Sequence, residues 1–232
     1  RNTLPAIMAA VLQPGVNKGD VVTVFPADHY IGNNDVFIGI LHESMPLASE
    51  SIVTFGIKPL YAEKGYGYIQ PGEPSKNGYY VQSFKEKPDE ATAGIYIKNR
   101  YLWNAGIFMF SADVFLGEVE RYEPGIFSAF SSGGDIREIV ASIEKGISID
   151  KGVLEKSGKV TVVPMDIEWS DLGSFDSIYN IMPVVPFEPE PGDSEVGAGA
   201  SYHMIMRKDN GIYLRGEKGT VLVRRGRYIP RN

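Results

Sequence analysis

The stretch DVVTVFPAD, residues 20–28, decides the fold. Its β-branched and aromatic residues, Val21 to Phe25, favour a strand, and Pro26 ends it. A carboxylate, Asp28, follows at the mouth of this apolar strand. Two interpretations are open: Asp28 caps the turn that comes next, or it holds a metal ion at the carboxyl end of a sheet.

Strands and helices are predicted to alternate along the rest of the chain. This order predicts an α/β fold with a Rossmann-like, mostly parallel sheet flanked by helices. Such sheets bind ligands at the carboxyl ends of their strands, so functional residues are expected in the loops there. The predicted strands are 21–25, 51–57, 79–87, 101–110 and 159–165. The predicted helices are 3–13, 34–49 (which Pro46 can end early), 90–100, 111–124, 135–146 and 175–182.

The sequence changes character after Pro183. Residues 184–201 are rich in Pro, Gly and Glu, which is typical of a linker or a poorly ordered loop. Residues 202–232 contain short strand-like runs separated by turns that contain glycine. We therefore expect one main domain over residues 1–183, and over residues 184–232 a linker followed by a small C-terminal β appendage.

The composition narrows the possible function classes. The chain has 232 residues, a formal charge of -6 and a pI of about 5.2, so it offers no broad basic surface for nucleic acid. It contains no cysteine, which excludes disulfides and thiolate metal sites and fits a reducing, cytoplasmic location. No apolar run approaches the roughly 20 residues of a membrane span, so no membrane partner is expected.

Asp28 and Asp171 are the candidate metal ligands. Each follows a hydrophobic strand or its loop, in the segments FPAD and EWSDLG. Two carboxylates at one sheet edge can hold Mg²⁺ through oxygen, with phosphate oxygens and water completing the octahedron. Bound Mg²⁺ neutralises charge on phosphates during transfer. Each Asp can instead cap a turn, and their separation in the sequence does not by itself pair them.

Three other strand ends carry residues suited to a sugar phosphate. Glu86 can accept hydrogen bonds from sugar hydroxyls, and its neighbour Lys87 can bind phosphate as a point charge. Gly67 lets the backbone approach a ligand closely, and the ring of Tyr66 can stack on a sugar. Asn104 is an amide inside a strand and can bridge hydroxyls. The structural alternatives are a solvated charge pair, a plain turn and a β-bulge, respectively.

Eight short segments occur in a fixed order along the chain: RNTLPAI, FPADH, TFGIKP, GYGYI, FKEKPD, YLWNAGIFMF, SIDKGVLEKS and VVPMDIEWSDLGSF. In this order they resemble the mannose-1-phosphate guanylyltransferases, which belong to the sugar-nucleotidyltransferase superfamily. The resemblance runs from Arg1 to about Pro183. The segments SIDKGVLEKS and EWSDLGS favour the mannose branch over the related glucose-1-phosphate enzymes.

The resemblance implies an activity, a cofactor and catalytic residues. The family transfers GMP from GTP to mannose 1-phosphate, which gives GDP-mannose and pyrophosphate. In this chain Asp28 and Asp171 would coordinate Mg²⁺, and Lys87 would contact the sugar phosphate. A phosphate oxygen of mannose 1-phosphate would attack the α-phosphorus of GTP in line, so positioning and charge neutralisation would carry most of the reaction.

The resemblance also implies a sugar pocket within a nucleotidyltransferase catalytic domain over residues 1–183. Glu86 and Asn104 would bind the mannose hydroxyls. Gly67 would present its backbone to the sugar, with Tyr66 nearby.

Other positions match the family less closely. Asn2 and Thr3 lie where the family lines the guanosine pocket, and Asp150, in the SID segment, would be sugar-side or structural. The family's first strand and its Gly-rich loop, GGxGxRLxP, are absent from the sequence. We therefore expect that native residues precede Arg1.

Two other functions stay open at this point. One is a related nucleotidyltransferase that uses glucose 1-phosphate and another nucleotide. The other is a non-catalytic subunit that senses nucleotide sugars, having kept the pocket and lost the phosphate loop. The expected partners are GTP and mannose 1-phosphate, and the family suggests a homodimer paired through the C-terminal region.

Overall fold

The computed structural model describes residues 2–143, 146–173 and 177, and it adds the backbone of the strands 185–186, 201–202, 204–208, 211–216, 219–224 and 227–230. The chain forms two compact units, which are described separately. The first contains Arg1–Ala27 and Ile31–Trp169, and the second contains Asp28–Tyr30 and Ser170–Asn232. The helix predicted over 175–182 lies outside the described residues except for Ser177, and the domain boundary predicted after Pro183 stays a prediction.

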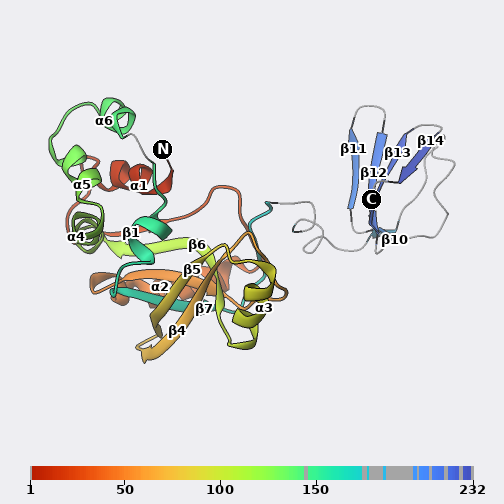
Figure 1. Ribbon diagram of the computed structural model, residues 1–232, viewed down its shortest axis with the longest axis horizontal. Helices are drawn as coiled ribbons and strands as arrows, with labels where there is room; N and C mark the ends of the chain where they lie inside the picture. Colours follow the sequence, from red (N-terminus) through yellow and green to blue (C-terminus); the bar gives the residue numbers. More distant parts are fainter. Residues whose placement is uncertain are drawn as a thin grey trace. The chain divides into compact units, whose positions relative to one another are not determined.

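A six-stranded mixed sheet forms the centre of the first unit, in the order β1-β6-β3-β7-β5-β4 (Figure 1). β3 and β7 pair in parallel, and the other pairings of this sheet are antiparallel. It follows that β1, β3, β4 and β7 run in one direction, whereas β5 and β6 run in the other. The α/β class is confirmed, with most strands sharing one direction. The strands are β1 Val21–Val24, β3 Ile52–Ile57, β4 Gly67–Ser75, β5 Gly78–Glu86, β6 Leu102–Ser111 and β7 Val160–Met165.

The strand β4 closes part of this sheet into a ring. It pairs with β5 along most of its length and also with β6, through Tyr68 opposite Trp103 and Ile69 opposite Leu102. Because β5 pairs with β7, the strands β6, β3, β7, β5 and β4 form a closed circuit of neighbours. Register shifts in β4 at Gln70 to Pro74 bend the hairpin, as bulges do, so that it can reach both partners.

Helices cover both faces of the sheet, as the alternating pattern predicts. One hydrophobic cluster packs the sheet against α1, α4, α5 and α6, which Figure 1 shows gathered on one side, and a second packs it against α2, η1 and α3. Phe115 of α4, for example, is fully buried and stacks on Phe110 of β6 at 4.5 Å. Burying a side chain of this size stabilises a fold by about 1.5–3 kcal/mol. The helices are α1 Thr3–Val11, α2 Asn34–Ser44, η1 Met45–Ser49, α3 Glu90–Lys98, α4 Ala112–Tyr122, α5 Pro124–Ser131, α6 Ile136–Ser142 and the π-helical turn η2 Asp150–Leu154.

The second unit contains a four-stranded antiparallel sheet in the order β11-β12-β13-β14. These strands confirm the short C-terminal strands that the sequence predicts. Their bounds are β11 Met204–Lys208, β12 Gly211–Gly216, β13 Gly219–Arg224 and β14 Arg227–Pro230, with the short pair β9 Val185–Pro186 and β10 Ser201–Tyr202 beside them in the sequence. A further two-stranded ladder joins β2, Tyr30–Ile31, to β8, Trp169–Ser170.

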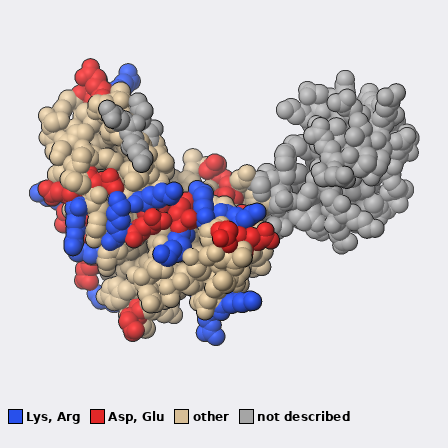
Figure 2. Space-filling model, in the orientation of Figure 1, with Lys and Arg blue, Asp and Glu red and all other residues tan. Residues whose placement is uncertain are grey.

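The described surface mixes both signs of charge. On the face drawn in Figure 2, Lys and Arg side chains lie beside Asp and Glu side chains rather than forming a field of one sign. Within the part of the chain that the structure describes, no helix combines the length and the apolar character that crossing a bilayer requires.

Candidate functional site

Asn104 lies in a bulge of β6. Phe108 pairs with Thr54 and Asn104 pairs with Gly56, so two steps along β3 match four along β6. Gly106 takes up the extra length with a positive φ of 69°. The structure therefore contains the β-bulge that the sequence analysis gave as an alternative for Asn104. The bulge places the Asn104 amide at a fixed position in the sheet.

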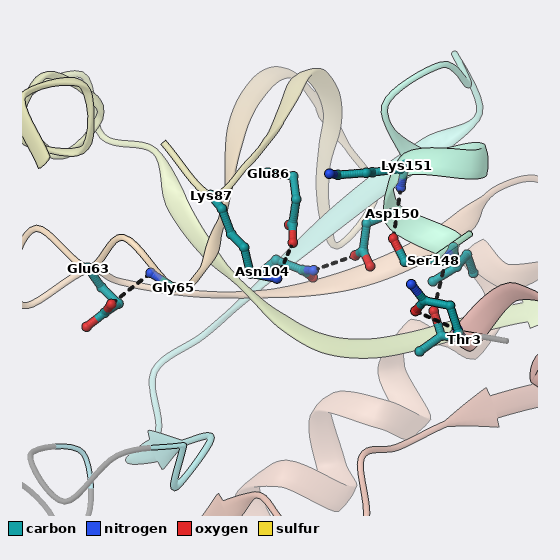
Figure 3. Close-up of polar contacts among 11 residues, drawn as sticks. Thr3, Glu63, Gly65, Glu86, Lys87, Asn104, Ser148, Asp150 and Lys151 are labelled. Atoms are coloured by element: carbon teal, nitrogen blue, oxygen red, sulfur yellow. Dashed lines mark hydrogen bonds and ion pairs between the residues drawn. The ribbon is translucent and has the colours of Figure 1, made fainter. Parts of the chain in front are cut away.

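Hydrogen bonds fix the orientation of this amide. Asn104 Oδ1 accepts from Thr54 Oγ1 at 2.9 Å and from the Gly106 N–H at 3.2 Å. Asn104 Nδ2 donates to Asp150 Oδ1 at 2.9 Å, which leaves its second N–H available to a ligand. Figure 3 shows Glu86 and Asp150 on either side of this amide.

Gly67 is buried and packs closely against these groups. It begins β4 opposite Glu86, the last residue of β5. A Cβ atom at Gly67 would lie 2.9 Å from Glu86 Oε2 and 3.3 Å from Asn104 Cβ. The pairing of β4 with both β5 and β6 therefore brings three sequence-predicted site residues, Gly67, Glu86 and Asn104, together, and only glycine fits between the other two.

Glu86 and Lys87 form an ion pair at the end of β5. Lys87 Nζ lies 2.8 Å from Glu86 Oε1, with the Glu86 side chain 12% exposed and the Lys87 side chain 62% exposed. Lys87 adopts a left-handed backbone, with φ of 49°, and its N–H donates to the Tyr66 carbonyl at 3.2 Å. This turn brings both side chains to one rim. The hydrogen bond that Lys87 donates to the Glu86 carboxylate raises the pKa of Lys87, so the ammonium stays charged.

Asp150 is the site residue whose role the sequence left undecided. It begins η2 and accepts from Asn104, so it belongs to the same constellation. Burial, followed by the negative charge of Glu86, raises the pKa of Asp150 from 3.8 to about 6, against smaller opposing effects that include Asn104 and Lys87. The SID segment pointed to Asp150 as a residue near the site. The protonation of Asp150 depends on burial, which this segment alone does not reveal.

This raised pKa predicts a pH-dependent stability. Between about pH 4 and pH 6 the folded state binds more protons at Asp150 than the unfolded state does, so its contribution to stability is lost as the pH rises through 6. The variant Asp150→Asn keeps an acceptor for Asn104 and carries no charge. We expect it to match the wild type near pH 4 and to be more stable above pH 6, as measured by urea unfolding across this range. A stability difference that is constant with pH would contradict the assigned cause.

The start of α1 is held beside Asp150. Asn2 caps the helix, since its Oδ1 accepts from the Thr3 N–H at 2.8 Å. Thr3 Oγ1 accepts from the Ile149 N–H at 3.0 Å, and the Leu4 N–H donates to the Ile147 carbonyl at 3.2 Å. Two residues predicted to line a nucleotide pocket, Asn2 and Thr3, thus lie next to the turn that carries Asp150 (Figure 3).

The ring of Tyr66 is held by two tryptophans, and its contact with a sugar stays a prediction. It packs edge-on against Trp103 at 5.1 Å and Trp169 at 5.3 Å. Trp103 belongs to the hydrophobic cluster that packs against α2, η1 and α3, whereas Phe84, which lies against Gly67, belongs to the other cluster. Tyr66 contributes to the site through its carbonyl, which fixes Lys87.

Asp28 and Asp171 belong to the second unit. Asp28 is exposed in the bend before β2, and Asp171 follows β8, where its Oδ1 accepts from the Gly173 N–H at 3.0 Å. One oxygen of Asp171 thus caps the turn after β8, and its role as a metal ligand stays a prediction. The Gly32 N–H donates to the Glu168 carbonyl, so the end of β2 lies beside the start of β8. The residues before β2 and after β8 therefore lie at the same end of this short ladder.

Two carboxylates at one end of a ladder are suitable oxygen donors for a hard cation such as Mg²⁺. Among the described residues no group of three or more His, Asp or Glu side chains is arranged to hold a metal. A divalent ion there would therefore depend on ligands from water and from phosphate, which is how Mg²⁺ is commonly bound.

The fold and this constellation define a nucleotidyl transferase. The family model described as nucleotidyl transferase matches residues 1–186, and the chain belongs to this family. It is 40% identical over 204 residues to mannose-1-phosphate guanylyltransferase 2 of Escherichia coli O157:H7, which covers 78% of this chain and 42% of that protein. The chain thus spans less than half the length of the curated relatives it matches.

Two solved structures show the same fold. One, from Thermus thermophilus, is described as a mannose-1-phosphate geranyltransferase; it is 32% identical, with a TM-score of 0.72 over 81% of this chain and 57% of that one. The other, described as a mannose-6-phosphate isomerase of Helicobacter pylori, is 29% identical, with a TM-score of 0.62 over 73% of this chain and 70% of that one.

Proposed function

We propose that this chain is the sugar-phosphate-binding part of a mannose-1-phosphate guanylyltransferase, which transfers GMP from GTP to mannose 1-phosphate. The observation that carries the proposal is the close grouping of Glu86 and Asn104 around Gly67, where no side chain fits. The relative from Escherichia coli O157:H7, which is 40% identical, is named for this substrate. Other functions, such as a glucose-1-phosphate enzyme or a nucleotide-sugar sensor, would use the same residues. The experiment must therefore distinguish these functions from the proposed one.

The polar groups around Gly67 match the chemistry of a sugar. Glu86 presents carboxylate oxygens that accept hydrogen bonds from hydroxyls, and Asn104 presents a remaining N–H that donates to a hydroxyl oxygen. Because the Asn104 amide is already fixed by three hydrogen bonds, little conformational entropy is lost when the sugar binds. The missing side chain at Gly67 lets Glu86 and Asn104 lie close together beside the start of β4.

Lys87 would bind the phosphate of the same ligand. Its ammonium is mostly exposed and lies at the rim where Glu86 ends β5. A phosphate oxygen of mannose 1-phosphate would then form a bond to the α-phosphorus of GTP. The bond from that phosphorus to the bridging oxygen would break, and pyrophosphate would leave with the electron pair. No protein nucleophile is needed, because the attacking phosphate is already anionic and the protein's task is to position it.

Asp28 and Asp171 are the residues that we propose hold Mg²⁺. The ion would supply charge neutralisation for the triphosphate. Asn2 and Thr3, beside the Asp150 turn, are proposed to contact the guanosine.

Pyrophosphate release tests this function. With the intact gene product that carries this chain, we expect release from GTP with mannose 1-phosphate at a rate at least about 10-fold above that with glucose 1-phosphate, since a site that hydrogen-bonds particular hydroxyls discriminates strongly. Removal of divalent cations with EDTA should abolish release. Equal or faster release with glucose 1-phosphate would favour the glucose-type alternative, and binding of the sugar phosphate without any release would favour the sensor.

A further inference from the structure

We propose that the first unit contains a second ligand site, which binds a nucleoside phosphate. The site is a cavity of about 570 Å³ at the carboxyl ends of β3 and β7, beside the start of β6. Its lining includes Lys58 after β3, Asp166 after β7, and Arg100 before β6. Cavities of roughly 300–1,000 Å³ are typical of small-molecule sites. None of the residues assigned to the sugar phosphate lines it.

Two cations make the cavity suitable for an anion. Lys58 and Arg100 both line it, and among the described residues neither has an acidic partner within 4.0 Å. A guanidinium presents a planar fork that matches phosphate oxygens, and an ammonium adds a point charge. Two such groups lining one cavity can therefore bind a phosphate without first breaking an ion pair.

The backbone at Arg100 gives an independent reason to assign it a ligand. α3 ends in a Schellman motif, in which the Arg100 N–H donates to the Ile97 carbonyl and the Tyr101 N–H to the Tyr96 carbonyl, each at 3.0 Å. Arg100 occupies the left-handed position of this motif with φ of 61°. Glycine is favoured there because an L side chain is strained. The chain carries an arginine at this position instead, despite the backbone strain, and this residue lines the cavity.

The other residues that line the cavity favour a ligand that contains further groups besides a phosphate. Leu102 and Met165 are apolar, and Tyr101 is held in place by its hydroxyl, which donates to Gln70 Oε1 at 2.8 Å, and by stacking on Tyr96 at 4.4 Å. The Asp166 carboxylate would repel a lone phosphate but would accept hydrogen bonds from ligand hydroxyl or amino groups. A nucleoside phosphate has an anion, a planar apolar body and such donors, which matches this set.

The cavity also borders the sugar-phosphate constellation. Gly56 lines the cavity and is the ladder partner of Asn104, and Leu102 precedes Asn104 by two residues on β6. The two sites therefore share strands but use different side chains. This separation makes it possible to remove one without altering the other.

Calorimetric titration of GDP into the full 232-residue chain tests the proposal, with Arg100→Gly as the main variant. This change removes the guanidinium and places the favoured residue at the helix end, so the fold is retained and its melting temperature should rise. We expect GDP binding to weaken by at least about tenfold, the effect of losing a charge-assisted hydrogen bond. Lys58→Gln should weaken it similarly. Lys98→Gln, an exposed cation on the same helix that does not line the cavity, should leave it unchanged.

Three outcomes would overturn the proposal. They are no GDP binding by the wild type, wild-type affinity in both Arg100→Gly and Lys58→Gln, and binding that is lost in Asn104→Ala but kept in Arg100→Gly. The last would assign GDP to the sugar-phosphate constellation and would leave the proposed function standing. Conversely, a failure to release pyrophosphate would remove the proposed function without changing these titrations.

Discussion

Replacing Gly67 by alanine is expected to weaken the binding of mannose 1-phosphate by about 100-fold or more. The new methyl group would lie 2.9 Å from Glu86 Oε2 and 3.2 Å from Phe84 Cζ, so the Glu86 carboxylate must move. A displacement of about 1 Å in a positioning residue can cost a factor of about 100. Titration of mannose 1-phosphate at constant pH and ionic strength measures the effect.

Gly65→Ala is the matched control for this variant. Gly65 lies two residues earlier in the same loop, and a Cβ there would approach only the Glu63 side chain, at 3.2 Å. Its φ is not positive, so alanine is tolerated. Wild-type affinity in Gly67→Ala would refute the proposed sugar site. Equal weakening in both variants would indicate a general disturbance of the loop rather than the loss of a specific contact.

Gly78→Ala is expected to destabilise the first unit by about 3 kcal/mol or more. A Cβ at Gly78 would collide with the carbonyl oxygen of Val162, and also approach the Val163 side chain at 3.2 Å. The next residue, Tyr79, pairs with Val162, so the collision occurs where β5 joins β7. Backbone atoms cannot move aside as a side chain tip can, and overpacking of this kind typically costs about 1–3 kcal/mol and sometimes more. Urea unfolding followed by circular dichroism gives the change.

The comparison for this variant is Gly117→Ala in α4. No atom lies within 4 Å of a Cβ built there, and the residue is exposed in a helix. Alanine in a helix interior is favoured over glycine by about 0.5–1 kcal/mol, so this variant should gain stability. If Gly78→Ala unfolded at the same urea concentration as the wild type, this result would contradict the close packing of β5 against β7 at Gly78.

The sequence predicted where the polar residues lie because strand ends are local features. Glu86 follows an alternating strand, and Asn104 interrupts an apolar one, so both were recognisable as single residues. The strand and helix pattern likewise predicted most elements of the first unit and the α/β class. The structure ends α2 at Ser44 and continues as η1, which agrees with Pro46 as an early stop.

Features that depend on which strands are neighbours could not be predicted from the sequence. The contact of Gly67 with Asn104 needs β4 to pair with β6, a choice made by tertiary packing. The same is true of the ring of Tyr66, whose edge contacts with Trp103 and Trp169 depend on the tertiary fold. The raised pKa of Asp150 requires the burial that the assembled unit supplies. A local signal for the second cavity did exist, in an arginine that follows Asn99 at a helix end.

The closed circuit of strands has a consequence for how the protein is made. The groups of the proposed sugar site and the adjoining Asp150 come from positions 67, 86, 104 and 150, and the circuit completes only when a hairpin formed early meets strands that are synthesised later. Contacts between distant positions are slow to form because loop entropy must be overcome first. Substrate should therefore bind only the fully assembled sheet, and by mass action it should protect newly made chains from degradation. The availability of sugar phosphate in the cell would then set how much of the protein accumulates as well as how fast it works.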